Sequence, residues 1–229
     1  MRQVPDYGDD RNKGFCVHCG GREETSDHIP SKVLLDEPFP ENLTACASCL
    51  RCNNGFSRDE EYLACVLECV LTGDVAPELI ERSKIAHILR RSPKLAESLR
   101  HAKHVVDGQT IWDVDMDRVK HVLLKFARGH VAYELNEPRL DEPEFFYCRP
   151  LTTMSSDQRK AFEASEEIGI WPEVGSRALS RLLVVGSDVY EEGWLLVQEG
   201  RYRFRTLQGS GPRVRIVLRE YLACEVAWD

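Results

Sequence analysis

The middle of the chain places apolar residues at helical spacing. Tyr62, Leu63, Val66, Leu67 and Val70 recur every three or four positions, which predicts a helix that ends at Gly73. The same spacing predicts further helices over residues 77–91 and from Asp117 towards Leu135. A third is predicted to begin with Ser92 as its N-cap and Pro93 as its first residue. A shorter helix is predicted over residues 157–165, with Ser156 as its N-cap.

The last third of the chain alternates apolar and polar residues. This pattern predicts four strands, over residues 194–197, 201–207, 213–218 and 222–228. Gly200 and the Gly209–Pro212 segment separate them, so we expect an antiparallel meander. Arginines occupy alternate positions of two of these strands, which is typical of a solvated sheet face. A platform for nucleic acid is the alternative use of those arginines.

The N-terminal part contains too few apolar residues to form a core without help. Residues 1–14 are polar and unlike a secretory signal. Within residues 15–72, the apolar side chains ahead of the first helix are few, and they include Phe15, Val17, Val33, Leu34, Leu35 and Phe39. A bound metal would be needed to fix such a small unit. We therefore expect an α+β protein with a lead-in over 1–14, a metal-stabilised module over 15–72, and a helical and β accessory or targeting region over 73–229.

Composition limits the classes of function. The chain has 229 residues, and its formal charge of −8 argues against a purely electrostatic binder of nucleic acid. No apolar run approaches the roughly 20 residues of a membrane span, so no membrane partner is expected. Nine cysteines without an export signal suggest the reducing cytoplasm, where thiols bind metals rather than form disulfides.

Four cysteines are spaced as zinc ligands. Cys16-x-x-Cys19 and Cys49-x-x-Cys52 each supply two sulfurs, and four sulfurs complete a tetrahedral zinc site. Cys46 offers another pairing, Cys46-x-x-Cys49. The alternative to any metal site is a set of buried free thiols.

Polar residues with catalytic potential surround these pairs. Asp27-His28 lies between the pairs, and Asn53-Asn54 follows the second one. Asp27 and Asn53 could hold a hard divalent cation through oxygen, while the neighbouring His28, projecting to the other side of an extended segment, could deprotonate water. The alternatives are an acid that only orients a histidine, and an asparagine that only caps a helix.

The arrangement of these residues resembles the HNH endonuclease family, whose nuclease module is a ββα-metal finger. The resemblance covers residues 16–63 and includes Cys16-Val-His-Cys19, Asp27-His28-Ile-Pro-Ser-Lys32 and Cys49-Leu-Arg-Cys52-Asn53-Asn54. It implies that His28 is the general base, that Asp27 and Asn53 hold a catalytic Mg²⁺ or Mn²⁺, and that Cys16, Cys19, Cys49 and Cys52 hold structural zinc.

Two further roles follow from the resemblance. Asn42 is the candidate for the family's central asparagine, which braces the loop that carries the general base. The family's last metal ligand comes directly after the second knuckle, which favours Cys49 and Cys52 over Cys46 and makes Asn53 the ligand, with Asn54 as its substitute.

The expected function is therefore metal-dependent cleavage of DNA, with a role in a defence or mobile-element system plausible from the family alone. Its alternatives are a non-catalytic zinc module that binds nucleic acid or protein, and an effector that a protein partner activates or targets. Residues 82–104 are rich in lysine and arginine, and they could follow a phosphate backbone or form an ordinary solvated surface.

Overall fold

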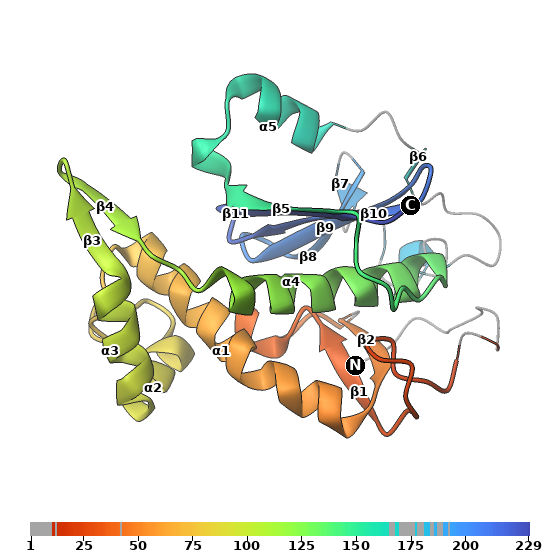
Figure 1. Ribbon diagram of the computed structural model, residues 1–229, viewed down its shortest axis with the longest axis horizontal. Coiled ribbons are helices and arrows are strands. Elements are labelled where there is room, and N and C mark those ends of the chain that lie inside the picture. The colour runs from red at the N-terminus through yellow and green to blue at the C-terminus, as the bar shows by residue number, and fades with distance from the viewer. Residues whose placement is uncertain are drawn as a thin grey trace. The chain divides into compact units, whose positions relative to one another are not determined.

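The chain forms two compact units (Figure 1). The first unit comprises Met1–Asn54 and Leu123–Asp229, and the second comprises Gly55–Val122. The expected module over 15–72 is thus divided between them. The computed structural model describes residues 11, 13–41, 43–164, 168–169, 177, 181–183, 186, 190–191 and 193–229. Most of the expected lead-in over 1–14 lies outside this set, as does residue 165 of the expected helix over 157–165.

A short hairpin and the start of a helix form the N-terminal part of the first unit. Strand β1 (Thr25–Ile29) pairs antiparallel with β2 (Thr44–Ser48), and the 3₁₀ turn η2 (Lys32–Leu34) lies between them. Helix α1 (Leu50–Thr72) follows β2 after one residue. The order strand, strand, helix is the one expected for this segment.

A seven-stranded antiparallel sheet makes up most of the rest of the first unit. The strands run in the order β5-β11-β10-β9-β8-β7, and β6 pairs with β9. Their bounds are β5 Phe145–Pro150, β6 Ile168–Gly169, β7 Tyr190–Glu191, β8 Trp194–Gln198, β9 Tyr202–Gln208, β10 Pro212–Leu218 and β11 Leu222–Ala227. Consecutive strands from β8 to β11 are neighbours, which confirms the expected antiparallel arrangement of the C-terminal strands. Strand β5 extends this sheet beside β11, although the sequence pattern did not predict it.

A short helical segment follows β5. The 3₁₀ turn η4 (Leu151–Thr153) leads to α5 (Ser156–Glu163). Ser155 caps α5 with its side chain and forms a reciprocal capping box with Gln158, so the cap lies one residue before the expected Ser156.

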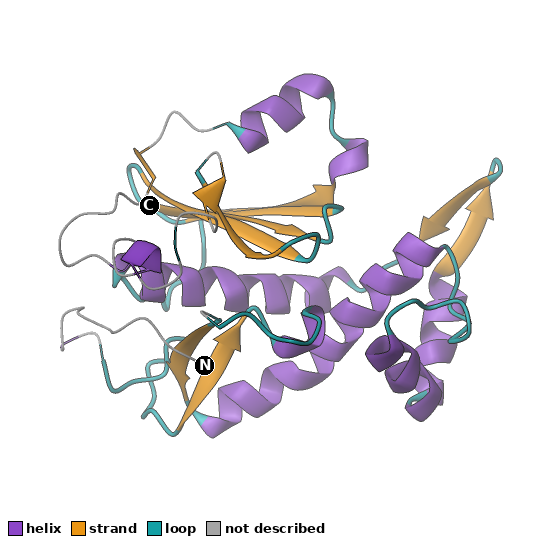
Figure 2. Ribbon diagram, turned by 180° about the vertical axis from the view of Figure 1, so that it is seen from behind, coloured by secondary structure: helices purple, strands orange, loops and turns teal. Residues whose placement is uncertain are grey.

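Helix α4 (Met116–His130) continues as the π-helical segment η3 (Val131–Leu135). The part of α4 in the first unit lies between the hairpin and the large sheet (Figure 2). On the hairpin side, Cβ of an alanine at Gly129 would lie only 1.6 Å from Cδ1 of Ile29, so helix and strand are in close contact. On the sheet side, the His130 ring stacks on Phe204 at 3.6 Å, and its Nε2 lies 2.7 Å from the Tyr202 hydroxyl.

The second unit contains the rest of α1, helices α2 (Ser83–Arg91) and α3 (Pro93–Ala102), and the hairpin of β3 (Lys103–Val106) and β4 (Gln109–Trp112). Helix α2 begins at Ser83 rather than near residue 77, because residues 77–82 form a turn and an irregular segment. Pro93 is the first residue of α3 as expected. The β3–β4 hairpin was not predicted, and its turn uses positive φ at Asp107 (50°) and Gly108 (76°), as tight two-residue hairpins require. No helix among the described residues combines the length and the apolar character that a bilayer crossing demands.

Candidate metal centre

The first pair of cysteines lies on a tight backbone loop. The Cys16 carbonyl accepts hydrogen bonds from the backbone N–H groups of Cys19 at 3.4 Å and Gly20 at 2.8 Å. Gly20 has φ of 71°, a conformation that glycine adopts without steric cost. This loop brings the two side chains of the pair to the same side.

The second pair lies at the start of α1. Cys49 precedes the helix, and its sulfur accepts a hydrogen bond from the Cys52 backbone N–H at 3.4 Å. The free N–H groups and the positive end of the helix dipole both favour a negatively charged sulfur at this position. Burial and the neighbouring sulfurs raise the pKa of the Cys52 thiol, so a bound metal would be needed to hold that sulfur as a thiolate.

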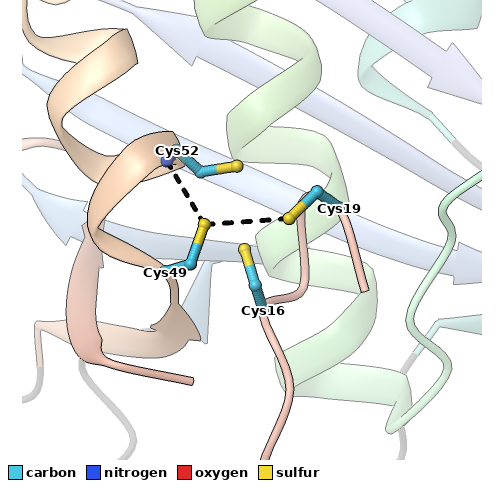
Figure 3. Close-up of side chains that lie close together, drawn as sticks. All are labelled: Cys16, Cys19, Cys49 and Cys52. Atoms are coloured by element: carbon cyan, nitrogen blue, oxygen red, sulfur yellow. Dashed lines mark hydrogen bonds between the residues drawn. The ribbon is translucent and has the colours of Figure 1, made fainter. Parts of the chain in front are cut away.

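The four sulfurs converge on one point (Figure 3). All lie within 4.8 Å of one another, and the Cys19 and Cys49 sulfurs are 3.7 Å apart. Zinc–sulfur bonds of about 2.3 Å in a tetrahedron place the sulfurs about 3.8 Å apart. Burial raises the pKa of the Cys16 thiol, but hydrogen bonds from the backbone near Cys49 and His18 outweigh it and lower the pKa to about 7. The donor set and its spacing fit a structural metal such as zinc.

Cys46 is not part of this cluster. It lies on β2, and its buried thiol donates a hydrogen bond to the Gly129 carbonyl at 3.4 Å. Burial raises its pKa to about 12, so it stays protonated. The structure thus separates Cys46 from Cys49 and brings Cys49 and Cys52 to the cluster.

The cysteine cluster also fixes the hairpin. The Val17 N–H donates to the Ala47 carbonyl, and the Glu24 N–H donates to the Ser48 carbonyl, both at 3.0 Å. The Cys16 sulfur lies 3.8 Å from the Ser48 hydroxyl. Metal bound at the cysteines would therefore hold β2, and through it the paired strand β1 that carries Asp27 and His28.

Asp27 is buried and paired with a lysine. Its carboxylate is 2.7 Å from the Lys125 ammonium, which also donates to the Ser31 hydroxyl at 3.1 Å. The other carboxylate oxygen lies 3.4 Å from Nε2 of His18. Burial opposes ionisation, but His18 and Lys125 hold the pKa of the Asp27 carboxyl below its ordinary value. Asp27 is thus a charged group that already has a cation beside it.

His28 lies on the opposite face of β1, because successive side chains of a strand alternate. It is partly buried, and this burial together with the nearby Lys32 charge lowers the pKa of its imidazole. A histidine with a lowered pKa is neutral at pH 7, the state that a general base needs.

Asn53 lies in the first turn of α1, where its side-chain amide donates to the Ser26 carbonyl at 3.4 Å. The hydrogen bonds and ion pairs of the described residues do not join it to Asp27. Asn54 is exposed on the same helix, and Asn42 lies outside the described residues.

The expected magnesium site does not match this arrangement. A hydrated Mg²⁺ needs open oxygen ligands, whereas the Asp27 side chain is 6% exposed and is bonded to an ammonium group. The residues as they stand do not form a ligand set for Mg²⁺. The structure brings the four cysteines together, whereas Asp27 is bonded to Lys125 and Asn53 to the Ser26 carbonyl.

Sequence reasoning missed Lys125. This residue lies between Leu124 and Phe126, in a helix that is buried on several sides, and its side chain has no exposed surface. A lysine inside such an apolar run is a signal, since lysine is almost never fully buried without a partner. The identity of that partner, 98 residues earlier in the chain, has no signal in the local pattern.

Comparison of the chain with protein-family models, with curated proteins and with solved structures gives no match.

Proposed function

We propose that this chain is an HNH-type endonuclease that hydrolyses phosphodiester bonds in DNA, with His28 as the general base. The observation that supports the proposal best is the order β1–β2–α1 beside a four-cysteine cluster, with Asp27-His28 on β1. The cluster would hold structural zinc, and this metal would keep His28 at a fixed position on the hairpin.

His28 would take a proton from the water that attacks the scissile phosphate. Its lowered pKa favours this role, because the neutral imidazole has a free nitrogen lone pair. Lys32 is close enough to lower the pKa of His28, so its charge would also act on a phosphate that approaches the imidazole. Lys32 thus joins His28 as a candidate contact of the substrate.

Asp27, the carboxylate expected to bind a catalytic Mg²⁺ or Mn²⁺, is bonded to Lys125. Asp27 would have to leave Lys125 before it could bind a cation, so we assign no step of the reaction to such a metal. The experiment therefore measures whether cleavage needs a divalent cation.

The test is nicking of supercoiled plasmid by the full chain with Mg²⁺, with Mn²⁺ or with EDTA. We expect His28→Ala to lower the rate by about 10²–10⁴-fold, the usual contribution of a general base, with zinc content unchanged. His104→Ala is the matched control, because His104 is an exposed histidine on β3 of the second unit. Equal rates for wild type and His28→Ala would exclude His28 from the reaction.

A non-catalytic zinc module is the second candidate, and the Asp27–Lys125 pair favours it. That pair occupies the carboxylate that a metal-dependent nuclease would need. This module would bind nucleic acid or a protein partner without turnover. Absence of nicking by wild type under every metal condition, with zinc bound, would select this candidate or an effector that needs a partner.

We also propose that the protein works in the cytoplasm. All nine cysteines are free, including Cys148 and Cys224, which face each other across β5 and β11. Neighbouring thiols that remain unoxidised are typical of proteins in a reducing compartment.

A further inference from the structure

Helices α2 and α3 of the second unit each have one apolar face and one exposed face. The buried side chains of α2 are Ile85, Ala86, Ile88 and Leu89, and those of α3 are Ala96 and Leu99. The remaining positions recur at helical spacing, so each helix presents a continuous exposed face. The two helices pack against each other, and α3 leads directly into β3 (Figure 1).

The exposed faces of these helices are strongly cationic. Their exposed charged residues are one acid, Glu97, and five bases, Lys84, Arg90, Arg91, Lys94 and Arg100. The chain as a whole has 30 lysines and arginines against 38 acids, so this local excess is contrary to the overall charge. These five bases form the cationic surface of the second unit.

Nearby acids neutralise only part of the positive charge. Arg91 has a partner, Glu61, at 2.9 Å, but this pair is largely exposed and such pairs are weak. Arg90 donates to the Pro77 carbonyl at 3.5 Å, which leaves its charge uncompensated. Among the described residues, Lys94 and Arg100 have no ion pair. At least three cations of the surface thus face solvent with no acidic partner in the part of the chain that the structure describes.

We propose that the cationic surface binds the sugar–phosphate backbone of duplex DNA. The inference rests on the proposed function, because a nuclease with a net charge of −8 needs a local surface that attracts its substrate. Lysine and arginine on exposed helix faces bind phosphates without reading sequence, and each contact releases a counterion. The surface would supply affinity, while His28 on the first unit would supply chemistry.

The experiment measures binding of a fluorescently labelled DNA duplex of 20 base pairs by fluorescence anisotropy. The full chain carries His28→Ala and the buffer contains no Mg²⁺ or Mn²⁺, so that cleavage cannot disturb the measurement and zinc stays bound. The test variant adds Lys94→Glu and Arg100→Glu. The matched control instead adds Arg159→Glu and Lys160→Glu, which make the same charge change at exposed positions of α5 in the first unit.

We expect the test variant to bind at least 10-fold more weakly than the parent, and the control to bind within 3-fold of the parent. The slope of log K against log salt should fall by about 2 in the test variant alone, because two phosphate contacts are lost. A milder pair, Lys94→Gln with Arg100→Gln, should show the same direction, and thermal melting of each variant checks that it is folded.

Equal binding by the test variant and the control would overturn the inference, as would absence of DNA binding by the parent. Tighter binding of a duplex RNA of the same sequence would also overturn it. These outcomes are separate from failure of the proposed function, since plasmid nicking that depends on His28 can persist while the cationic surface proves inert. Conversely, DNA binding through Lys94 and Arg100 with no nicking would support the inference and favour the non-catalytic module.

Discussion

The two units differ in how many charged side chains they bury. The first unit buries several charged side chains, and its Asp27–Lys125 pair has almost no exposed surface. The second unit keeps most of the charges of α2 and α3 at the surface and buries aliphatic side chains beneath them. Near the hairpin, the interior of the first unit thus contains a cysteine cluster and an ion pair at 2.7 Å. The interior of the second unit is mainly apolar and includes the longer ion pair of Arg82 with Glu68, at 3.7 Å. The two units should therefore respond differently to changes of metal, charge and pH.

The largest difference is expected from loss of a zinc ligand. Cys49→Ser should release the metal and unfold the N-terminal part of the first unit, because zinc contributes on the order of 10 kcal/mol in small zinc modules. Zinc content by mass spectrometry and thermal unfolding by circular dichroism measure the two effects. Cys69→Ala, at a buried cysteine of the second unit, is the control, and it should retain zinc. Full zinc content and unchanged melting in Cys49→Ser would contradict the assignment of the cluster.

The second prediction concerns the buried ion pair. Lys125→Met leaves the Asp27 carboxylate buried without its cation, which should lower the free energy of unfolding by about 3–5 kcal/mol. Adding Asp27→Asn should recover part of this loss, because the unpaired charge is then removed. Lys120→Met, at an exposed position of α4 in the second unit, should change stability by less than about 0.5 kcal/mol. Urea unfolding measures the stability of all three variants. An unchanged free energy of unfolding in Lys125→Met would show that the pair does not stabilise the first unit.

The third prediction uses two helical glycines. Gly129→Ala should destabilise the first unit by about 1–3 kcal/mol, since its Cβ would collide with Cδ1 of Ile29. Ile29→Val removes that atom and should offset part of the cost. Gly55→Ala should stabilise by up to about 1 kcal/mol, because Gly55 lies in α1 of the second unit with no atom near its Cβ position. Destabilisation of both variants to the same extent would mean that the Ile29 contact is not the cause.

The smallest expected effect is a dependence on pH. Burial lowers the pKa of His130 well below 6.5, so the unfolded chain binds this proton more readily than the folded one. The stability contribution is complete above pH 6.5 and decreases as the pH falls below it, by at most about 1.4 kcal/mol per pH unit. His18 and His28 also have lowered pKa values and act in the same direction. Urea unfolding at pH 7.5 and 5.5 measures the change in stability. His130→Phe should reduce the difference between the two pH values by the contribution of one proton. An unchanged difference would show that His130 does not titrate as its burial requires.

Much of the fold followed from local sequence patterns. Alternation predicted β8 to β11 to within about a residue. The expectation that their arginines lie on a solvated face was wrong for Arg205 and Arg215, which are buried and donate to backbone carbonyls of residues 161–164. Cysteine spacing predicted the cluster, because two Cys-x-x-Cys pairs can together supply the four sulfurs of a tetrahedral metal site. Strand β5 was missed because it is short and only half-buried, so its pattern is weak without the partner strand β11.

The candidate site was less predictable than the fold. Asp27 and His28 do point in opposite directions, as adjacent strand residues must. The partner of Asp27 is Lys125, which comes from a distant helix, and such a contact depends on tertiary packing alone. Local spacing could suggest a chemical role for Asp27, but it could not indicate that a lysine already neutralises it.

The first unit is discontinuous, and this has a consequence for how it can be made. Its N-terminal segment ends at Asn54 and its remainder begins at Leu123, so the second unit is synthesised in between. At about 5–20 residues per second, a ribosome would need several seconds after Asn54 to produce the residues that cover the hairpin. A fragment cut after the cysteine motif would therefore expose Ile29 and leave Asp27 without its counter-ion, however well it bound zinc.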